Sequence, residues 1–317
     1  MNTELIDAAW DRVQGHVRRT PLLNHPALDA IAGRRLLVKA ECLQLTGSFK
    51  ARGAWAAVSA LPAGTTGVIA YSSGNHAQGV ARAAAAHGLP AVIIMPADAP
   101  IAKIEGTRAL GGEVVLYNRE TEDRDAIGTE IAAARGLALI KPYDDPQVIA
   151  GQASVGIEIA DELGDIAAEV VVPCGGGGLT AGIALALAQR APHMRVRPAE
   201  PEGFDDTARS LAKGVITRNA RLGGSICDAI VTPQPGDLTF PILQAHCLSG
   251  LTVTEDQVLQ TMALALRHMK IVIEPGGAVA LAAALFQPQA FGSDTVVAVA
   301  SGGNVDPGLL ARAIDLM

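Results

Sequence analysis

The sequence predicts an α/β protein with two lobes, built on mostly parallel, twisted sheets that are flanked by helices. Short apolar runs rich in Val and Ile alternate with alanine-rich segments nearly from end to end, a pattern typical of βαβ units. At 317 residues the chain is also longer than a typical single domain. Together the two observations favour two lobes, each with a core of its own.

The elements follow from the same pattern. The apolar runs predict strands at 35–39, 67–71, 91–95, 113–117, 137–141, 168–173, 194–198 and 294–300. The alanine-rich segments predict helices at 4–17, 48–60, 75–87, 101–110, 123–135, 147–163, 179–190, 255–270, 276–286 and 306–315. The helix at 255–270 has the clearest start, because Thr254 and Gln257 stand at capping-box spacing with acidic residues in the first turn.

The segment 67–144 contains four strand-like apolar runs with predicted helices between them. We therefore expect residues 67–144 to form a small domain, and residues 1–66 plus 145–317 to form a large domain together. A cleft between two such domains is a common place for a small-molecule site.

Composition and charge exclude several classes of protein. No run reaches the roughly 18 uncharged apolar residues of a membrane-spanning helix, and the acidic N-terminus does not resemble a secretory signal. The sequence therefore predicts a cytoplasmic protein without a membrane partner. The four cysteines lack C-x-x-C spacing, which argues against structural zinc and disulfides. A net charge of −7 without a long Lys/Arg cluster argues against nucleic-acid binding.

A run of four glycines, Gly175, Gly176, Gly177 and Gly178, follows an apolar strand and opens a helix in "VVVPCGGGGLTAGIALAL". Glycines let successive backbone N–H groups converge on an anion, and the helix start adds its positive end, so the run predicts a phosphate site. Gly176, Gly178 and Ala181 also fit G-x-G-x-x-A. A nicotinamide-dependent oxidoreductase built on residues 168–200 is therefore an alternative, and a non-catalytic small-molecule-binding protein is a third.

Three further stretches carry polar groups suited to a ligand. In "TGSFK", Lys50 is either a surface charge or a reactive amine at a helix start. In "SSGNH", hydroxyls and N–H groups at a strand-to-helix turn could hold a carboxylate, or could simply cap the helix. The loop "EPEGFDD" is either a solvated acidic loop or a set of oxygen ligands for Mg²⁺ or Ca²⁺.

Six motifs taken in order make a more specific case: "GSFKARGA", "SSGNHAQGVA", "PCGGGGLTAGIA", "AEPEGFDD", "IEPGGAVALAA" and "SGGNVDP". They closely resemble the fold type II pyridoxal-phosphate enzymes, in the branch of threonine dehydratase, serine racemase and hydroxyaspartate dehydratase. The resemblance covers the chain from about residue 4 to its end. It implies a two-lobe fold like that of the tryptophan synthase β chain, with pyridoxal 5′-phosphate in the cleft between the domains, and a homodimer.

The resemblance assigns cofactor-binding roles. Lys50 matches the lysine that forms a Schiff base with the cofactor, Phe49 the aromatic that packs on its ring, and Asn75 the residue that bonds its phenolic oxygen. The phosphate cradle corresponds to Gly175 through Gly178 and the Leu179 backbone. Ser301 matches the hydroxyl beside the pyridine nitrogen.

It also assigns substrate and metal sites. The substrate α-carboxylate falls at a turn formed by Ser72, Ser73, Gly74, Asn75 and His76. A divalent cation, either Mg²⁺, Ca²⁺ or Mn²⁺, falls at Glu200, Asp206 and the carbonyl of Phe204.

The chemistry implied is loss of water from a 3-hydroxy-2-amino acid, giving a 2-oxo acid and ammonia. Lys50 would take the Cα proton as general base, and Ser73 could protonate Cα from the other face, which keeps a serine or aspartate racemase as an alternative. Arg124 matches an arginine at the distal end of the substrate and favours 3-hydroxyaspartate over serine or threonine. Tyr143 stands where dehydratases have an aromatic residue, which favours elimination.

Overall fold

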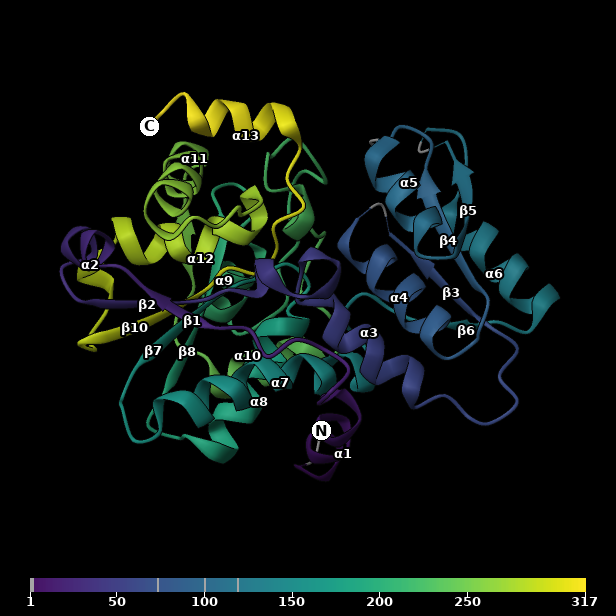
Figure 1. Cartoon of the computed structure of the whole chain (residues 1–317), viewed down its shortest axis with the longest axis horizontal. Coiled ribbons are helices and arrows are strands. Elements are labelled where there is room, and N and C mark those ends of the chain that lie inside the picture. The colour runs from purple at the N-terminus through teal and green to yellow at the C-terminus, as the bar shows by residue number, and fades with distance from the viewer. Residues whose placement is uncertain (1–2, 73, 100, 119) are drawn as a thin grey trace.

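The computed structural model describes residues 3–72, 74–99, 101–118 and 120–317. Figure 1 shows two lobes, each built around its own sheet. The large lobe carries a six-stranded sheet, and the small lobe carries a four-stranded sheet formed by residues 68–139. The predicted α/β class is confirmed, whereas the domain limits at 67 and 144 stay a prediction.

The sheet of the large lobe has the strand order β1-β2-β10-β7-β8-β9, and only β1 runs antiparallel to its neighbour. Its central strands β7 and β10 are buried on both faces, which explains their unbroken Val-rich sequences. In Figure 1, α11 and α12 cover one face, and α7 and α8 cover the other. The strands are β1 (Leu22–Asn24), β2 (Arg35–Lys39), β7 (Glu169–Pro173), β8 (Arg195–Pro201), β9 (Leu251–Val253) and β10 (Thr295–Val299).

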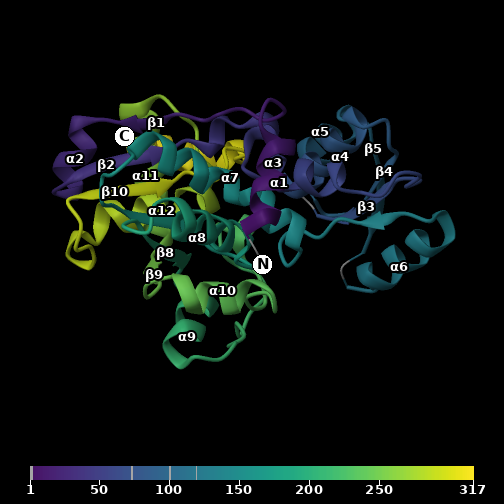
Figure 2. The ribbon, with the colours of Figure 1, turned by 90° about the horizontal axis from the view of Figure 1, so that it is seen from below.

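The helices of the large lobe connect these strands, and Figure 2 shows α9 and α10 on its outer side, beyond β8 and β9. They are α1 (Thr3–Val13), α2 (Pro26–Ala32), α3 (Lys50–Ser59), α7 (Pro146–Leu163), α8 (Gly178–Arg190), α9 (Asp206–Lys213), α10 (Thr239–His246), α11 (Glu255–Leu264), α12 (Pro275–Phe286) and α13 (Pro307–Ile314). Short 3-10 turns include η1 (Glu41–Leu43), η2 (Leu45–Gly47), η3 (Asp228–Ile230) and η5 (Pro288–Ala290).

The sheet of the small lobe is entirely parallel, in the order β5-β4-β3-β6. Alternate strand residues face opposite sides: Ile93 packs in the cluster that includes α4, whereas Ile94 packs in the cluster that includes α6. The elements are β3 (Val68–Tyr71), α4 (Asn75–Ala86), β4 (Ala91–Pro96), α5 (Ile101–Ala109), β5 (Gly112–Tyr117), α6 (Arg124–Arg135) and β6 (Ala138–Leu139).

Several predicted boundaries are wrong. The first helix ends at Val13 rather than 17, and the strand predicted at 137–141 is only β6. The helix predicted at 255–270 does begin with the capping box, but α11 ends at Leu264 and continues as a π-helical turn over Ala265–Met269. Within the described residues, none of the helices has the length and apolar character needed to cross a bilayer.

Helix α3 lies between the lobes and packs on α4 of the small lobe and on α7 of the large lobe. Two glycines permit this close approach. A Cβ at Gly79 of α4 would lie 3.1 Å from the Lys50 carbonyl, and one at Gly151 of α7 would lie 2.7 Å from the Arg52 carbonyl. One apolar cluster therefore runs through both lobes, and α1 lies beside α3 along it (Figure 2).

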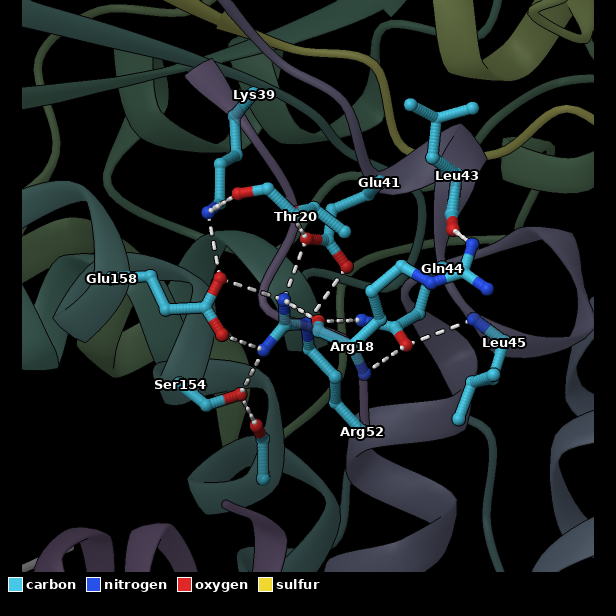
Figure 3. Close-up of polar contacts among 11 residues, drawn as sticks. Arg18, Thr20, Lys39, Glu41, Leu43, Gln44, Leu45, Arg52, Ser154 and Glu158 are labelled. Atoms are coloured by element: carbon cyan, nitrogen blue, oxygen red, sulfur yellow. Dashed lines mark hydrogen bonds and ion pairs between the residues drawn. The ribbon is translucent and has the colours of Figure 1, made fainter. Parts of the chain in front are cut away.

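A buried group of four charges anchors α3 to the large lobe (Figure 3). Arg52 donates to both oxygens of Glu41, at 2.8 Å each, and to both oxygens of Glu158, at 2.6 and 2.9 Å. Lys39 donates to Glu158 at 2.6 Å. Two cations thus balance two carboxylates. Burial opposes ionisation of Glu41, but Arg52, Lys39 and Thr20 together outweigh burial and lower the pKa of Glu41.

Candidate functional site

A cavity of about 650 Å³ opens between the two lobes. Its walls come from the ends of parallel strands and the helix starts that follow them, where α/β proteins bind ligands. Nearly every predicted cofactor and substrate residue lines it: Phe49, Lys50, Ser72, Gly74, Asn75, His76, Arg124, Tyr143, Gly175, Gly176, Gly177, Gly178, Leu179 and Ser301. The structure therefore brings together residues that are far apart in the sequence.

Lys50 is the first residue of α3, and its side chain reaches into the cavity. Its Nζ donates a hydrogen bond of 2.5 Å to the carbonyl oxygen of Pro142, and lies 5.2 Å from the centre of the Phe49 ring. Burial lowers the pKa of Lys50 to about 8. A neutral amine, which can act as nucleophile or base, is therefore accessible near physiological pH.

The glycine run forms an anion cradle at the start of α8. The carbonyl of Gly176 accepts hydrogen bonds from the Gly236 N–H at 3.2 Å and from the Thr239 hydroxyl at 2.6 Å. Within the described part of the chain, no backbone N–H from residue 175 to 180 has a protein acceptor. Such unpaired N–H groups at a helix start suit a phosphate.

Two glycines of this cradle cannot be replaced without moving their neighbours. Gly177 adopts φ +89, a left-handed conformation that favours glycine. A Cβ at Gly176 would overlap the ring of Tyr143, which lies against the cradle. Burial and the Asp144 charge raise the pKa of Tyr143, and the Arg124 charge opposes that rise. Both Arg124 and Tyr143 line the cavity.

Asn75 begins α4 and links two side chains of the large lobe, Glu274 and Asn304. Its Nδ2 donates to Glu274 Oε1 at 2.5 Å, and its Oδ1 accepts from Asn304 Nδ2 at 2.7 Å. Glu274 is buried, lines the cavity and immediately precedes α12. Burial raises the pKa of Glu274 to about 7.

His76 lines the cavity as a neutral ring. Its Nε2 lies 2.9 Å from the Ile140 carbonyl, which can only accept, so Nε2 carries the proton. Burial and the nearby Lys50 charge lower the pKa of His76 to about 3. The imidazole therefore carries no positive charge for a carboxylate, and the helix start supplies the N–H donors instead.

Three serines were also predicted to contact the cofactor or the substrate. Ser72 Oγ accepts from the Gly74 N–H at 3.2 Å, which is local turn bonding, and Ser73 lies outside the described residues. The buried Ser301 hydroxyl has no hydrogen-bond partner among the described residues and lines the cavity. It is therefore available to a ligand.

The acidic loop folds beside the cavity rather than within its lining. Glu200 is buried and accepts from the N–H groups of Thr207 and Ala208 at 2.8 and 2.7 Å. Burial and the Asp206 charge raise the pKa of Glu200, and burial raises that of Asp206 to about 6. Asp206 Oδ2 is buried and has no hydrogen-bond partner among the described residues. Phe204, two positions earlier in the sequence, is also buried. Among the described residues, no three His, Cys, Asp or Glu side chains gather as metal ligands.

Sequence reasoning missed some cavity residues. Glu274 had no assigned role, although it stands in the motif "IEPGGAVALAA". Lys103 of α5 and Asp228 of η3 also line the cavity, and they form an ion pair of 3.4 Å between the lobes. Residues 230–236 supply part of one wall. The two charged residues have no motif of their own, so only the folded chain identifies them.

Comparisons with known proteins agree with this geometry. The family described as "Pyridoxal-phosphate dependent enzyme" matches residues 13–302. An L-threo-3-hydroxyaspartate ammonia-lyase from Pseudomonas sp is 41% identical over 96% of this chain and 95% of its own length. An L-threonine ammonia-lyase from Thermotoga maritima is 36% identical over 98% of this chain and 78% of its own length. The solved structure of maize serine racemase superposes with a TM-score of 0.93 at 34% identity, covering 99% of this chain and 97% of that one.

Proposed function

Because this chain belongs to the pyridoxal-phosphate dependent enzyme family, we propose that it is a dehydratase, or ammonia-lyase, acting on a 3-hydroxy-2-amino acid. The favoured substrate is 3-hydroxyaspartate, which would give iminosuccinate and then oxaloacetate with ammonia. The observation that carries this choice is the position of Arg124, whose side chain lines the same cavity as Lys50. L-serine and L-threonine are the next candidates.

The residues present fit pyridoxal phosphate. The unpaired N–H groups of residues 175–180 would hold its phosphate, Phe49 would pack on its ring, and Lys50 would bind it covalently. The free hydroxyl of Ser301 would face its pyridine nitrogen, and an Asn75 N–H would face its phenolic oxygen. When bound, the cofactor supplies an electron sink at the substrate Cα.

Lys50 would then move the Cα proton. The carbonyl of Pro142, at 2.5 Å, holds its Nζ in the cavity, and burial favours the neutral amine that accepts a proton. The neutral Ser301 hydroxyl cannot stabilise a protonated pyridine as a carboxylate could, which disfavours transamination and favours prompt loss of the substrate's 3-hydroxyl. Tyr143, an aromatic residue in the same cavity, supports elimination over racemisation.

The two ends of a dicarboxylic substrate would meet different donors. The turn of Ser72, Ser73, Gly74, Asn75 and His76 would bind the α-carboxylate at the start of α4. Arg124, the first residue of α6, would bind the distal carboxylate, with Tyr143 beside it.

We also propose a divalent cation at Glu200, Asp206 and the Phe204 carbonyl, with Mg²⁺ favoured over Ca²⁺ and Mn²⁺. The support is the buried, unpartnered Asp206 Oδ2 and the mutual repulsion of the two carboxylates. A hard cation would relieve that repulsion, because it favours oxygen ligands.

Membership of the family leaves no place for the nicotinamide hypothesis. The glycine run at 175–178 lies in the same cavity as Lys50, as a pyridoxal-phosphate site requires. We also propose that the protein is a cytoplasmic homodimer and that residues 67–144 form its small domain. Size-exclusion chromatography with light scattering tests the homodimer.

The proposal is tested by measuring 2-oxo acid release from the stereoisomers of 3-hydroxyaspartate and from L-serine, D-serine and L-threonine. We expect the highest kcat/KM for one 3-hydroxyaspartate isomer, with oxaloacetate and ammonia formed in equal amounts. A higher kcat/KM for serine or threonine would refute the substrate assignment. Racemised amino acid in place of 2-oxo acid would refute the dehydratase assignment.

A further inference from the structure

The orientation of the Asn75 amide is determined by its neighbours. Asn304 Nδ2 donates to the Thr46 backbone carbonyl at 2.8 Å and to Asn75 at 2.7 Å. A backbone carbonyl can only accept, so the Asn304 atom in contact with it is the nitrogen. The Asn75 atom that faces Asn304 must therefore be its oxygen.

The nitrogen of Asn75 then lies on the side of Glu274. It uses one N–H to donate to Glu274 Oε1 at 2.5 Å, and its second N–H has no acceptor among the described residues. Glu274 is only 5% exposed. Its backbone is also fixed, because its N–H donates to the Gly302 carbonyl at 3.0 Å. Gly302 has no room for a side chain, since a Cβ there would overlap Glu274 Oε1.

We infer that Glu274 is a positioning residue of the cofactor site: it holds the Asn75 amide so that the free N–H points to the phenolic oxygen of pyridoxal phosphate. The inference rests on the cofactor placement proposed above. A carboxyl group suits this task, because its oxygen accepts from Asn75 in either protonation state.

In this placement the Asn75 amide would link the Glu274 carboxyl to that phenolic oxygen. The Lys103 charge of α5 lowers the pKa of the Glu274 carboxyl, and the Asp228 charge of η3 raises it. The Glu274 charge in turn raises the pKa values of the Cys42 and Cys227 thiols. Burial raises the pKa of Glu274 to about 7, well above its ordinary value. The carboxyl is therefore mostly protonated below pH 7 and mostly ionised above it, and the field at the cofactor ring changes over that interval.

A double-mutant cycle tests the positioning role on the apoprotein. The dissociation constant of pyridoxal phosphate is measured by absorbance titration for wild type, Asn75→Ala, Glu274→Ala and the double variant. We expect Glu274→Ala to weaken binding about tenfold, the size of one hydrogen bond to a charged group, and to add nothing once Asn75 is absent. Equal losses in both backgrounds, or no loss in either, would overturn the inference.

A second measurement uses Glu274→Gln, which preserves the shape of the side chain and keeps an acceptor oxygen. The visible absorption band of the holoenzyme is recorded on both sides of pH 7. Wild type should show a spectral step with a midpoint near pH 7, and Glu274→Gln should lack it while binding the cofactor within about threefold of wild type. The same step in the variant would contradict the role of Glu274. Neither measurement uses a substrate, so neither depends on turnover of 3-hydroxyaspartate.

Discussion

Arg52 and Glu158 lie 106 positions apart in the sequence, and two hydrogen bonds of 2.6 and 2.9 Å join their buried side chains. Arg52 is two residues beyond Lys50 on α3, and Glu158 is on α7. The pair therefore fixes the helix that begins at Lys50.

Replacing Arg52 by Met should lower the free energy of unfolding by about 3–5 kcal/mol, because Glu41 and Glu158 would keep buried charges without their main partner. The control is Arg108→Ala, which breaks an exposed i,i+3 pair with Glu105 and should cost about 0.5 kcal/mol or less. Urea unfolding followed by circular dichroism measures both. A loss below about 1 kcal/mol for Arg52→Met would contradict this account of the buried cluster.

Lys50→Ala should remove the absorption band of the lysine-linked cofactor and reduce 2-oxo acid release by about a thousandfold or more, because both the covalent link and the base are lost. Borohydride treatment should fix the cofactor to the wild-type chain but not to this variant. Lys213→Ala, at the exposed end of α9, is the matched control. A stable borohydride adduct in Lys50→Ala would show that another lysine is used.

Uptake of pyridoxal phosphate by the apoprotein should become faster as pH rises, with a midpoint near pH 8. Burial lowers the pKa of Lys50 to about 8, and only its neutral amine attacks an aldehyde. The neutral fraction therefore falls as pH drops below 8. Stopped-flow absorbance on both sides of this midpoint measures the rate, and a midpoint near the 10.5 of an ordinary lysine would argue against the buried site.

Arg124→Ala should reduce kcat/KM for 3-hydroxyaspartate about a hundredfold and leave that for serine within about threefold, because only the first substrate has a distal carboxylate. Arg135→Ala is the control on the same helix. Its guanidinium pairs with Glu113 at 2.9 Å on the surface, away from the cavity lining. Equal losses of kcat/KM for both substrates would contradict the proposal that Arg124 binds the distal carboxylate.

EDTA should lower the melting temperature, and added Mg²⁺ should restore it, if Glu200 and Asp206 hold a cation. Asp206→Asn removes the like charge beside Glu200, so in EDTA this variant should melt above wild type and should not respond to Mg²⁺. Differential scanning fluorimetry measures these shifts. Unchanged melting of the wild type in EDTA would exclude a structural cation at this loop.

The sequence was sufficient to predict the central parallel strands and many of the residues that line the cavity. Strands such as β4 and β7 are buried on both faces, so their apolar runs have one structural explanation. The three-residue strands β1 and β9 were too short to give a pattern. Helix α10 was missed because Pro241 stands in its first turn, where proline is tolerated but suggests a break.

The contacts of Glu274 and Arg52 could not be predicted from the sequence. Asn75 and Glu274 are 199 positions apart in the sequence. The local sequence "IEPGGA" does not predict that the Glu274 carboxyl accepts a hydrogen bond from the Asn75 amide of the other lobe. Arg52 resembles an ordinary helix arginine in the sequence, yet it is fully buried with two carboxylates. In both cases tertiary packing, rather than periodicity, determines what the side chain contacts.

The buried charges around Arg52 also constrain the order in which the chain can fold. Helix α3 and helix α7 supply partners of one cluster, and the complete sheet of the small lobe, residues 68–139, lies between them in the sequence. Closing a loop of this length is slow and entropically costly. The small lobe, in which β3 pairs with β4 and β4 pairs with β5, can form first and shorten that loop. We therefore expect variants that destabilise the small-lobe sheet to slow the refolding of the whole protein, including the part they do not touch.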